Sequence, residues 1–390
     1  MVLTELVDKW TKEGVMEING YCDEKFAQVR DAFEQNFIER GDIGASYAAT
    51  LEGEYVIDLW AGHSDAARSK PWQEDTIINV YSSTKTMTFL CALMLADRGQ
   101  LNLDAAVAQY WPEFEANGKG EVKVKHILSH SAGLPGFSRP MSSEELYDWD
   151  LCCADLAAQA CWWEPGTQSG YHAITQGYLI GEVVRRVTSQ SIGQFFKTEI
   201  AEPIGADFHI GVDPVHFARI AELVAASEPA PLLEMDADSI PGKVFAGLDI
   251  SPETTASAGW RQAEIPAANG HGNARSLVRA QTAMANGGTA FGVELLSADG
   301  ARKALEPQTD GVDVVLGLPV RFALGYALPT PAVPISPNEN TLWWGGAGGS
   351  TIAVDTDAHL CSSYVMNQMD NQILGDPRGM SLAQALYACM

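Results

Sequence analysis

The segment from Thr84 to Arg98 constrains the fold more than any other feature of this sequence, because it has the composition of a helix without a polar face. Apolar side chains occupy nearly every direction around the expected helix axis, and Gly99 stands where such a helix would end. A helix that is apolar on all sides must be surrounded by protein. The segment therefore predicts a central helix that the rest of the chain buries.

Residue patterns near both ends of the chain predict strands and further helices. Two pairs of β-prone runs are typical of hairpins: Gly44 to Thr50 with Tyr55 to Ala61, and Ser350 to Asp355 with His359 to Met366. Helical periodicity recurs in four further stretches: Phe26 to Phe37, Ile174 to Val187, a helix from Ala274, and Ser381 to Ala388. The stretch from Ala268 to Asn273 is interpreted as a turn before the helix at Ala274.

Strands at both ends and a helix-rich centre predict an α/β fold of the α+β type. We expect one antiparallel sheet, flanked by helices and built from both ends of the chain, and a smaller helical lobe. Residues 1–88 and 176–390 are assigned to the α/β domain and residues 89–175 to the helical domain. The cleft between the two is the expected place for a small-molecule site.

The charge of the chain limits the partners that it can have. Twenty-five Lys and Arg residues face 50 Asp and Glu residues, which gives a formal net charge of −25. Such a surface repels phosphate groups, so we expect neither nucleic acid nor an anionic membrane as a partner. No apolar stretch is long enough to span a membrane. The oligomeric state is left open, including a homo-oligomer.

The N-terminus and the cysteines bear on the compartment. Residues Met1 to Gly14 carry charged side chains and lack the apolar run of a secretory signal peptide. The seven cysteines are odd in number and form no C-x-x-C pair. We therefore expect reduced thiols and a cytoplasmic protein. The mature form of an exported protein would have the same pattern.

Ser82 and Lys85 are the candidate catalytic pair, because they stand three residues apart at the start of the apolar helix. This spacing places the lysine one turn above the serine on the same face. A serine hydroxyl is a weak nucleophile until a neighbouring base removes its proton. A lysine becomes such a base when desolvation lowers its pKa.

The S-x-x-K tetrapeptide alone is also compatible with a helix-capping serine followed by a surface lysine. The surroundings of Lys85 argue against that alternative, because a lysine inside an all-apolar helix is costly unless it has a purpose. Gly62 to Ala66 imitates the G-x-S-x-G motif of another hydrolase fold, but no helix can follow it at Ser69-Lys70-Pro71. Ser64 is therefore interpreted as a loop residue.

Four motifs in this order resemble those of the serine β-lactamases and penicillin-binding proteins, and are most similar to the class C β-lactamase-like esterases, or family VIII carboxylesterases. The resemblance extends from about Ile43 to Asn367. The motifs are Ser82-Ser83-Thr84-Lys85, Lys125 to Pro135 (KHILSHSAGLP), Glu164 to Tyr171 (EPGTQSGY) and Trp343 to Ser350 (WWGGAGGS). The resemblance implies the predicted fold and a covalent acyl-enzyme on Ser82.

The resemblance also implies roles for individual residues. Tyr171 matches the tyrosine of the Y-x-N motif and would join the proton relay with Lys85. The backbone N–H groups of Ser82 and Ala347 would form the oxyanion hole. The sequence departs from the family at Ala173, where the motif has asparagine. His172, between Tyr171 and Ala173, is interpreted as structural.

The third motif departs from the β-lactamases more strongly. Trp344, Gly345 and Gly346 stand where the lactamases carry Lys-Thr-Gly, whose lysine and threonine help hold the carboxylate of the drug. A substrate-binding role is expected for the three residues, with the glycines allowing close approach of the backbone. Neutral esters need no cationic anchor, so the departure favours a carboxylesterase.

The predicted function is therefore a serine hydrolase of small carboxylic esters. β-Lactamase, D-alanyl peptidase, small-amide hydrolase and acyltransferase activities use the same acyl-enzyme and remain alternatives. A non-catalytic scaffold of the same fold is a further alternative, which the presence of Ser82, Lys85 and Tyr171 together disfavours. The sequence carries no metal-binding or nucleotide-binding motif, so no metal and no cofactor are expected.

Overall fold

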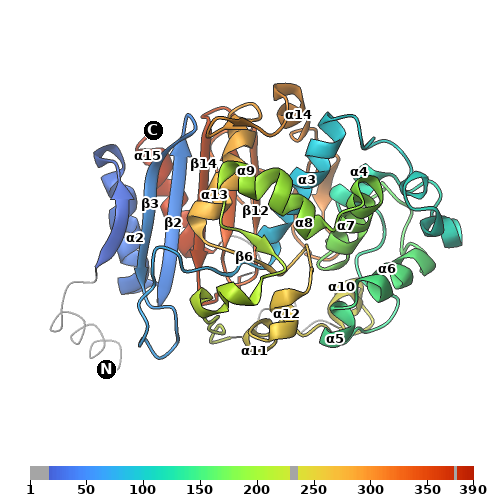
Figure 1. Ribbon diagram of the computed structural model, residues 1–390, viewed down its shortest axis with the longest axis horizontal. Helices are drawn as coiled ribbons and strands as arrows, with labels where there is room; N and C mark the ends of the chain where they lie inside the picture. Colours follow the sequence, from blue (N-terminus) through green and yellow to red (C-terminus); the bar gives the residue numbers. More distant parts are fainter. Residues whose placement is uncertain (1–16, 229–235, 373–375) are drawn as a thin grey trace.

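A nine-stranded antiparallel sheet forms the centre of the computed structural model, which describes residues 17–228, 236–372 and 376–390 (Figure 1). The prediction for Met1 to Gly14 lies outside these residues. In spatial order the strands are β1 (Ile18–Cys22), β3 (Glu54–Gly62), β2 (Gly44–Leu51), β14 (Leu360–Met366), β13 (Thr351–Asp355), β12 (Thr341–Gly345), β11 (Ala327–Leu328), β10 (Pro319–Phe322) and β9 (Thr309–Val312).

The two ends of the chain meet in the middle of this sheet. Strand β14 pairs over its whole length with Ala45 to Leu51 of β2, with Tyr47 opposite Tyr364. Both predicted hairpins are confirmed, β2 with β3 and β13 with β14. The antiparallel sheet built from both ends of the chain is therefore confirmed. The predicted domain boundaries at residues 88/89 and 175/176 stay a prediction.

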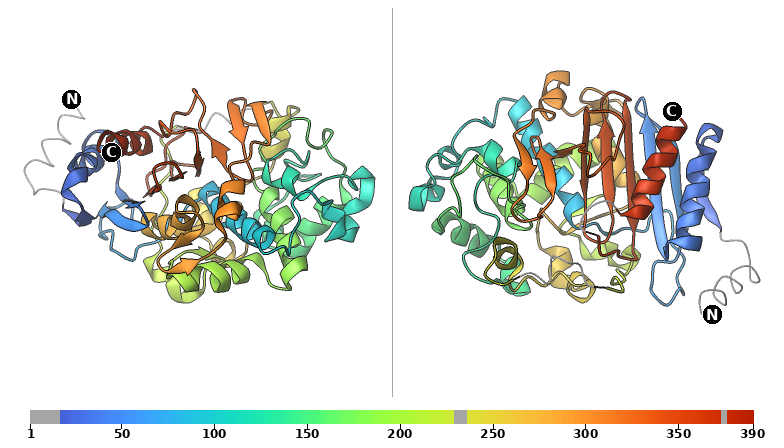
Figure 2. Two further views of the ribbon diagram at one scale, coloured as in Figure 1. Left: turned by 90° about the horizontal axis from the view of Figure 1, so that it is seen from above. Right: turned by 180° about the vertical axis from the view of Figure 1, so that it is seen from behind.

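Helices cover both faces of the sheet. On one face, α2 (Ala27–Glu39) and α15 (Pro377–Ala388) lie side by side (Figure 2). On the other face, α13 (Ala274–Ala285) packs on β2 and β14. Alternate residues of β2 point to the two layers, Tyr47 towards α2 and α15 and Ala48 towards α3 (Lys85–Asp97) and α13.

Helix α3 is the predicted central helix. Every residue from Lys85 to Leu95 is buried, and Gly99 takes a positive φ of 69° just beyond the end of the helix. The prediction that protein surrounds this segment on all sides is confirmed. The nucleophile segment is thereby anchored in the main core of the molecule.

Further helices fill the region beside the sheet, in the centre and on the right of Figure 1. They are α4 (Val124–Leu128), α5 (Ser143–Leu146), α6 (Trp149–Ala158), α7 (Thr175–Thr188), α8 (Ile192–Phe196), α9 (Glu202–Ile204), α10 (Ile240–Phe245), α11 (Pro252–Thr255) and α12 (Ala258–Gln262). Helix α14 (Ala298–Lys303) lies beside α3. Helix α7 confirms the helix predicted from Ile174 to Val187.

One local prediction is wrong. The stretch expected as a turn contains a strand, β6 (Gly270–Gly272), which lies between β4 (Ile78–Asn79) and β5 (His209–Ile210). A side chain at Gly270 or Gly272 would collide with the Phe208 ring, so the glycines reflect close packing rather than a turn.

No helix in the described ranges is long and apolar enough to cross a membrane. All seven cysteines are free thiols.

Candidate active site

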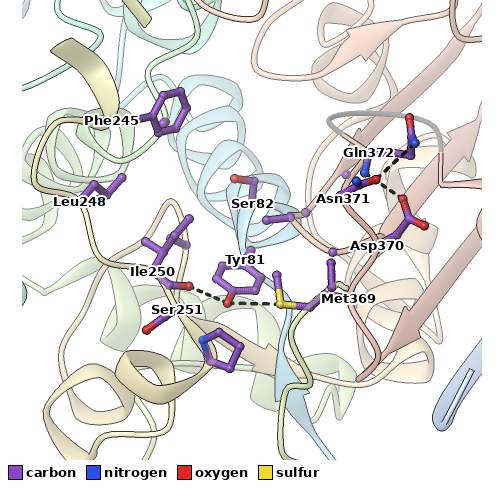
Figure 3. A pocket seen from close by; sticks show the side chains of 18 of the residues that line it. Tyr81, Ser82, Phe245, Leu248, Ile250, Ser251, Met369, Asp370, Asn371 and Gln372 are labelled. Carbon is purple, nitrogen blue, oxygen red and sulfur yellow. Dashed lines mark hydrogen bonds between the residues drawn. The ribbon is translucent and has the colours of Figure 1, made fainter. Parts of the chain in front are cut away.

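Ser82 lies at the start of a short 3₁₀ turn, η2 (Ser82–Thr84), which runs directly into α3. Strand β4 precedes this turn, and the chain bends sharply at Tyr81, which has φ 44° and ψ −127°. A non-glycine residue in this region is strained, and such strain persists only where the surroundings fix it. Here the Tyr81 hydroxyl donates to the Ile250 carbonyl oxygen at 2.8 Å (Figure 3). Ser82 is thereby presented to a cavity.

Lys85 is fully buried, and its amine group lies 3.1 Å from Ser82 Oγ. The amine also donates to the carbonyl oxygens of Ala173, at 2.7 Å, and of Ala267, at 2.9 Å. A neutral amine has two N–H groups and one lone pair, so the two carbonyls leave the lone pair for the Ser82 hydroxyl. Desolvation lowers the pKa of Lys85 well below its ordinary value, which favours this neutral form.

Tyr171 completes the polar cluster from the other side of Ser82. Its hydroxyl donates to Ser82 Oγ at 2.6 Å, and its ring lies 4.8 Å from the Lys85 amine. Burial raises the pKa of Tyr171, although its contacts with Ser82 and Trp344 act in the opposite direction. The phenol is therefore a proton donor at neutral pH, and Lys85 is the group suited to be the immediate base.

Two residues at the cavity wall, Ser82 and Ala347, have backbone N–H groups without an acceptor in the part of the chain that the structure describes. Within the described ranges, neither the Ser82 N–H nor the Ala347 N–H donates to another protein group. Ala347 lies in the turn that joins β12 to β13. In this turn a side chain at Gly346 would come within 2.1 Å of the Val80 carbonyl oxygen, so only glycine lets the turn approach the nucleophile segment.

Ser82 opens into an apolar cavity of about 380 Å³ (Figure 3). Its walls combine residues from the nucleophile turn, the Tyr171 segment, the β12–β13 turn and the loops before α11 and after β14. The large apolar side chains among them are those of Tyr81, Ile174, Phe245, Leu248, Ile250, Leu316, Trp344 and Met369. No lysine, arginine or histidine belongs to the part of the wall that the structure describes, whereas Glu228, Asp249 and Asp370 do.

Comparison with known proteins places this arrangement in a family. The family model described as Beta-lactamase matches residues 29–386. The chain belongs to the beta-lactamase family.

Several relatives of this beta-lactamase family member carry esterase and penicillin-binding names. A family VIII carboxylesterase structure is 41% identical and covers 96% of this chain and 100% of its own, with a TM-score of 0.91. A penicillin-binding protein homolog from Caulobacter crescentus is 38% identical, with the same coverages and a TM-score of 0.90. Esterase/beta-lactamase LipL of Mycobacterium tuberculosis is 33% identical over 90% of this chain and 83% of its own. These matches confirm the predicted fold class.

The structure brings together all the site residues that the sequence predicts for this family member. Ser82, Lys85 and Tyr171 form one hydrogen-bonded cluster, and Trp344, Gly345 and Gly346 line the cavity beside it. At Gly346 the close approach is to Val80, whereas the prediction assigned it to the substrate.

The two residues that follow Tyr171 have a structural explanation. At Ala173, where the family has asparagine, the backbone carbonyl serves Lys85. His172 is structural, as expected, because its Nε2 accepts from the Leu134 N–H while Nδ1 lies 2.6 Å from the Gly170 carbonyl oxygen. Burial lowers the pKa of His172 to about 3, so it carries no charge.

The described ranges hold no cluster of three or more metal-ligating side chains. A buried ionic cluster of Asp42, Asp376 and Arg378 lies near the site, and in it Arg378 donates to the Gly348 carbonyl oxygen at 3.1 Å. Through this hydrogen bond the cluster holds the β12–β13 turn in place. Sequence reasoning missed it, because Asp42 and Arg378 are 336 positions apart and no motif joins them.

Sequence reasoning also missed Tyr81, Ser350 and the Ala267 carbonyl. Ser350 Oγ donates to the Val80 carbonyl oxygen at 2.9 Å and thus holds the third motif against the nucleophile segment. Its place at the end of a glycine run was the available signal. A backbone carbonyl such as that of Ala267 has no signal in the sequence.

Proposed function

We propose that the protein is a serine carboxylesterase that cleaves small, uncharged carboxylic esters through an acyl-enzyme on Ser82. One observation carries the proposal: Ser82 Oγ lies between the Lys85 amine, at 3.1 Å, and the Tyr171 hydroxyl, at 2.6 Å, at the wall of an apolar cavity. A nucleophile, a base and a proton donor are thus in contact before substrate binds. The esterase names of the relatives support the same reaction class.

Acylation begins with proton transfer from Ser82 Oγ to the neutral Lys85 amine. The oxygen then bonds to the ester carbonyl carbon, and the N–H groups of Ser82 and Ala347 stabilise the oxyanion. When the C–O bond to the alcohol breaks, the Tyr171 phenol gives its proton to the departing oxygen. The Lys85 ammonium then returns a proton to the Tyr171 phenolate. The acyl-enzyme therefore holds a neutral amine and a neutral phenol.

Deacylation uses the same groups in reverse order. A water molecule gives its proton to the relay of Lys85 and Tyr171 while its oxygen bonds to the acyl carbon. The bond to Ser82 Oγ then breaks, and the serine recovers its proton. The carboxylic acid leaves, and Ser82, Lys85 and Tyr171 return to their starting protonation states.

The charge of the cavity wall favours esters over β-lactams. A penicillin or cephalosporin carries a carboxylate, which needs a cationic or hydroxylic anchor. The described wall contains three carboxylates and no cationic side chain, and Trp344 stands at the lactamase lysine position. The segments 229–235 and 373–375 contain no lysine, arginine or histidine. An anionic drug is therefore repelled, whereas a neutral ester is not.

The proposal includes a cytoplasmic location and a small-molecule partner. Seven free thiols are typical of a reducing compartment. The net charge of −25 supports the expectation that neither nucleic acid nor an anionic membrane binds.

Hydrolysis of p-nitrophenyl acetate, butyrate and octanoate beside a chromogenic cephalosporin tests the proposal, with Ser82→Ala as the control. We expect rapid turnover of the short esters, slow or no lactam opening, and no turnover by the variant. Fast lactam opening would assign the protein to the β-lactamases. Undiminished ester turnover by Ser82→Ala would overturn the acyl-enzyme.

A further inference from the structure

A buried carboxylate that the mechanism above does not use lies behind Tyr171. Asp313 is fully buried and follows β9 (Thr309–Val312) at the edge of the sheet. Its Oδ1 atom accepts three backbone N–H bonds, from Tyr171 at 3.0 Å, Val315 at 3.0 Å and Leu316 at 2.9 Å. One oxygen thus joins the backbone of Tyr171 to the loop that forms the cavity wall at Leu316.

The same two segments are joined by a second bond. The Val314 N–H donates to the Ser169 carbonyl oxygen at 3.0 Å, two positions before Tyr171. On the other side of Tyr171, the His172 N–H donates to His130 Nδ1 at 3.0 Å. The backbone around Tyr171 is therefore fixed on both sides, and at Tyr171 itself the acceptor is a carboxylate.

The second oxygen of Asp313 indicates that its charge has a role of its own. Asp313 Oδ2 is buried and has no hydrogen-bond partner among the residues that the structure describes. A buried carboxylate oxygen without a partner costs free energy. A neutral acceptor would serve the three N–H donors at a lower desolvation cost.

The charged and titratable groups around Tyr171 single out Asp313. Burial lowers the pKa of His130 well below its ordinary value and that of His172 to about 3, so both rings are neutral. Lys85 is the neutral base described above. The charge of Asp313 raises the pKa of Tyr171 further and keeps the phenol protonated.

We infer that Asp313 is a positioning residue that holds the Tyr171 phenol on Ser82 Oγ, ready to give its proton to the departing alcohol. This inference rests on the proposed function. Asp313 lies outside the four motifs of the family resemblance, and the inference gives it a part in breaking the C–O bond. The more basic the departing alcohol is, the more this step depends on a proton donor.

Two esters with the same acyl group test the inference, p-nitrophenyl butyrate and ethyl butyrate. p-Nitrophenolate departs without a proton, whereas ethoxide needs one. The measured quantity is kcat/KM, which reports acylation, for the wild type, Asp313→Ala and Asp313→Asn. We expect Asp313→Ala to lose about 100-fold on ethyl butyrate and at most about 10-fold on the nitrophenyl ester. Asparagine keeps an acceptor oxygen but not the charge, so Asp313→Asn should show the same selective loss on ethyl butyrate to a smaller extent.

The ratio of the two rates separates positioning from a structural role. A loss of equal size on both esters, or no loss on either, would overturn the inference, because a smaller folded fraction lowers both rates equally. If Asp313→Ala does not fold, Asp313→Asn decides the question in the wild-type and Tyr171→Phe backgrounds. A change in the ratio that vanishes with Tyr171→Phe supports the inference, and a persistent change or no change overturns it.

The proposed function and this inference fail separately. Ester turnover that survives Ser82→Ala would remove the proposed function. Turnover that depends on Ser82, combined with an unchanged ratio in the Asp313 variants, would remove only the role of Asp313.

Discussion

Two lysine side chains of the described chain are fully buried, Lys85 at the start of α3 and Lys119 in the loop before α4. Each amine lies beside an aromatic ring, 4.8 Å from Tyr171 for Lys85 and 5.2 Å from Phe114 for Lys119. Desolvation lowers the pKa of both. Burial and ring contact therefore do not distinguish the two sites.

The hydrogen-bond acceptors do distinguish them. The Lys119 amine donates to three carbonyl oxygens, those of Ala116, Ala157 and Gln159. Three acceptors match the three N–H groups of an ammonium, so Lys119 is held as a structural cation. Lys85 has only two carbonyl acceptors, and its third neighbour is a hydroxyl that can itself donate. A buried lysine becomes a base when its acceptors leave the lone pair directed at a proton.

The largest effect is expected at Lys85. Lys85→Arg puts a permanent cation in the place of the neutral amine, and Lys85→Met removes the amine. Each should lower kcat on p-nitrophenyl butyrate by about 10³-fold or more, because the serine loses its proton acceptor. Lys119→Arg, which keeps donors for the carbonyls, is the matched control and should stay within about twofold of the wild type. Activity above one tenth of the wild type in Lys85→Arg would refute the role of the neutral amine.

Tyr171→Phe gives Lys85 the same kind of neighbour that Lys119 has, a ring without a hydroxyl. Loss of the proton donor should lower kcat/KM on alkyl esters by about 10²-fold. The ring still fills its place, so the melting temperature should stay close to that of the wild type, measured by circular dichroism. A loss of activity matched by an equal loss of folded protein would show that the hydroxyl is needed for packing alone.

The contrast between the two lysines marks the limit of the sequence analysis. Periodicity predicted the central helix and both hairpins, because amphipathic or fully apolar patterns determine which faces are buried. Lys85 was identified because its helix has no polar face. Lys119 stands between Gly118 and Gly120, where a loop lysine is ordinarily exposed, so nothing in the sequence indicated its burial.

The missing parts of the site are backbone groups and contacts between distant segments. The carbonyl oxygen of Ala267 accepts a hydrogen bond from the Lys85 amine. Because it belongs to the backbone, the sequence does not indicate it. Asp313 meets Tyr171 across 142 positions, and its local sequence is that of an ordinary strand end. Such contacts depend on how the chain packs, which the local pattern does not specify.

At Lys119 the expected effect is on stability rather than on turnover. Lys119→Met leaves three carbonyl oxygens without a donor and should lower the free energy of unfolding by about 3 kcal/mol. Because Lys119 makes no contact with Ser82, kcat per folded molecule should stay within about twofold of the wild type. Urea denaturation, with the active fraction measured by serine-directed titration, checks both values. An unchanged midpoint would mean that the three carbonyls bind water instead.

The smallest effect separates the two lysines by pH. The pKa of Lys85 is lowered in the folded state, so between that lowered pKa and the ordinary value of 10.5 the unfolded chain binds one more proton than the native protein. The free energy of unfolding of the wild type should therefore rise relative to that of Lys85→Met as pH rises through this window, by at most about 1.4 kcal/mol per pH unit. Below the window both the folded and the unfolded state bind the proton, and the difference in free energy of unfolding is constant.

Urea denaturation of wild type, Lys85→Met and Lys119→Met at pH 6 and pH 9 measures this difference. The difference between wild type and Lys119→Met should change less with pH, because the pKa of Lys119 is less strongly lowered. A difference between wild type and Lys85→Met that does not change with pH would mean that Lys85 is a cation at neutral pH, and the two buried lysines would then differ only in their neighbours.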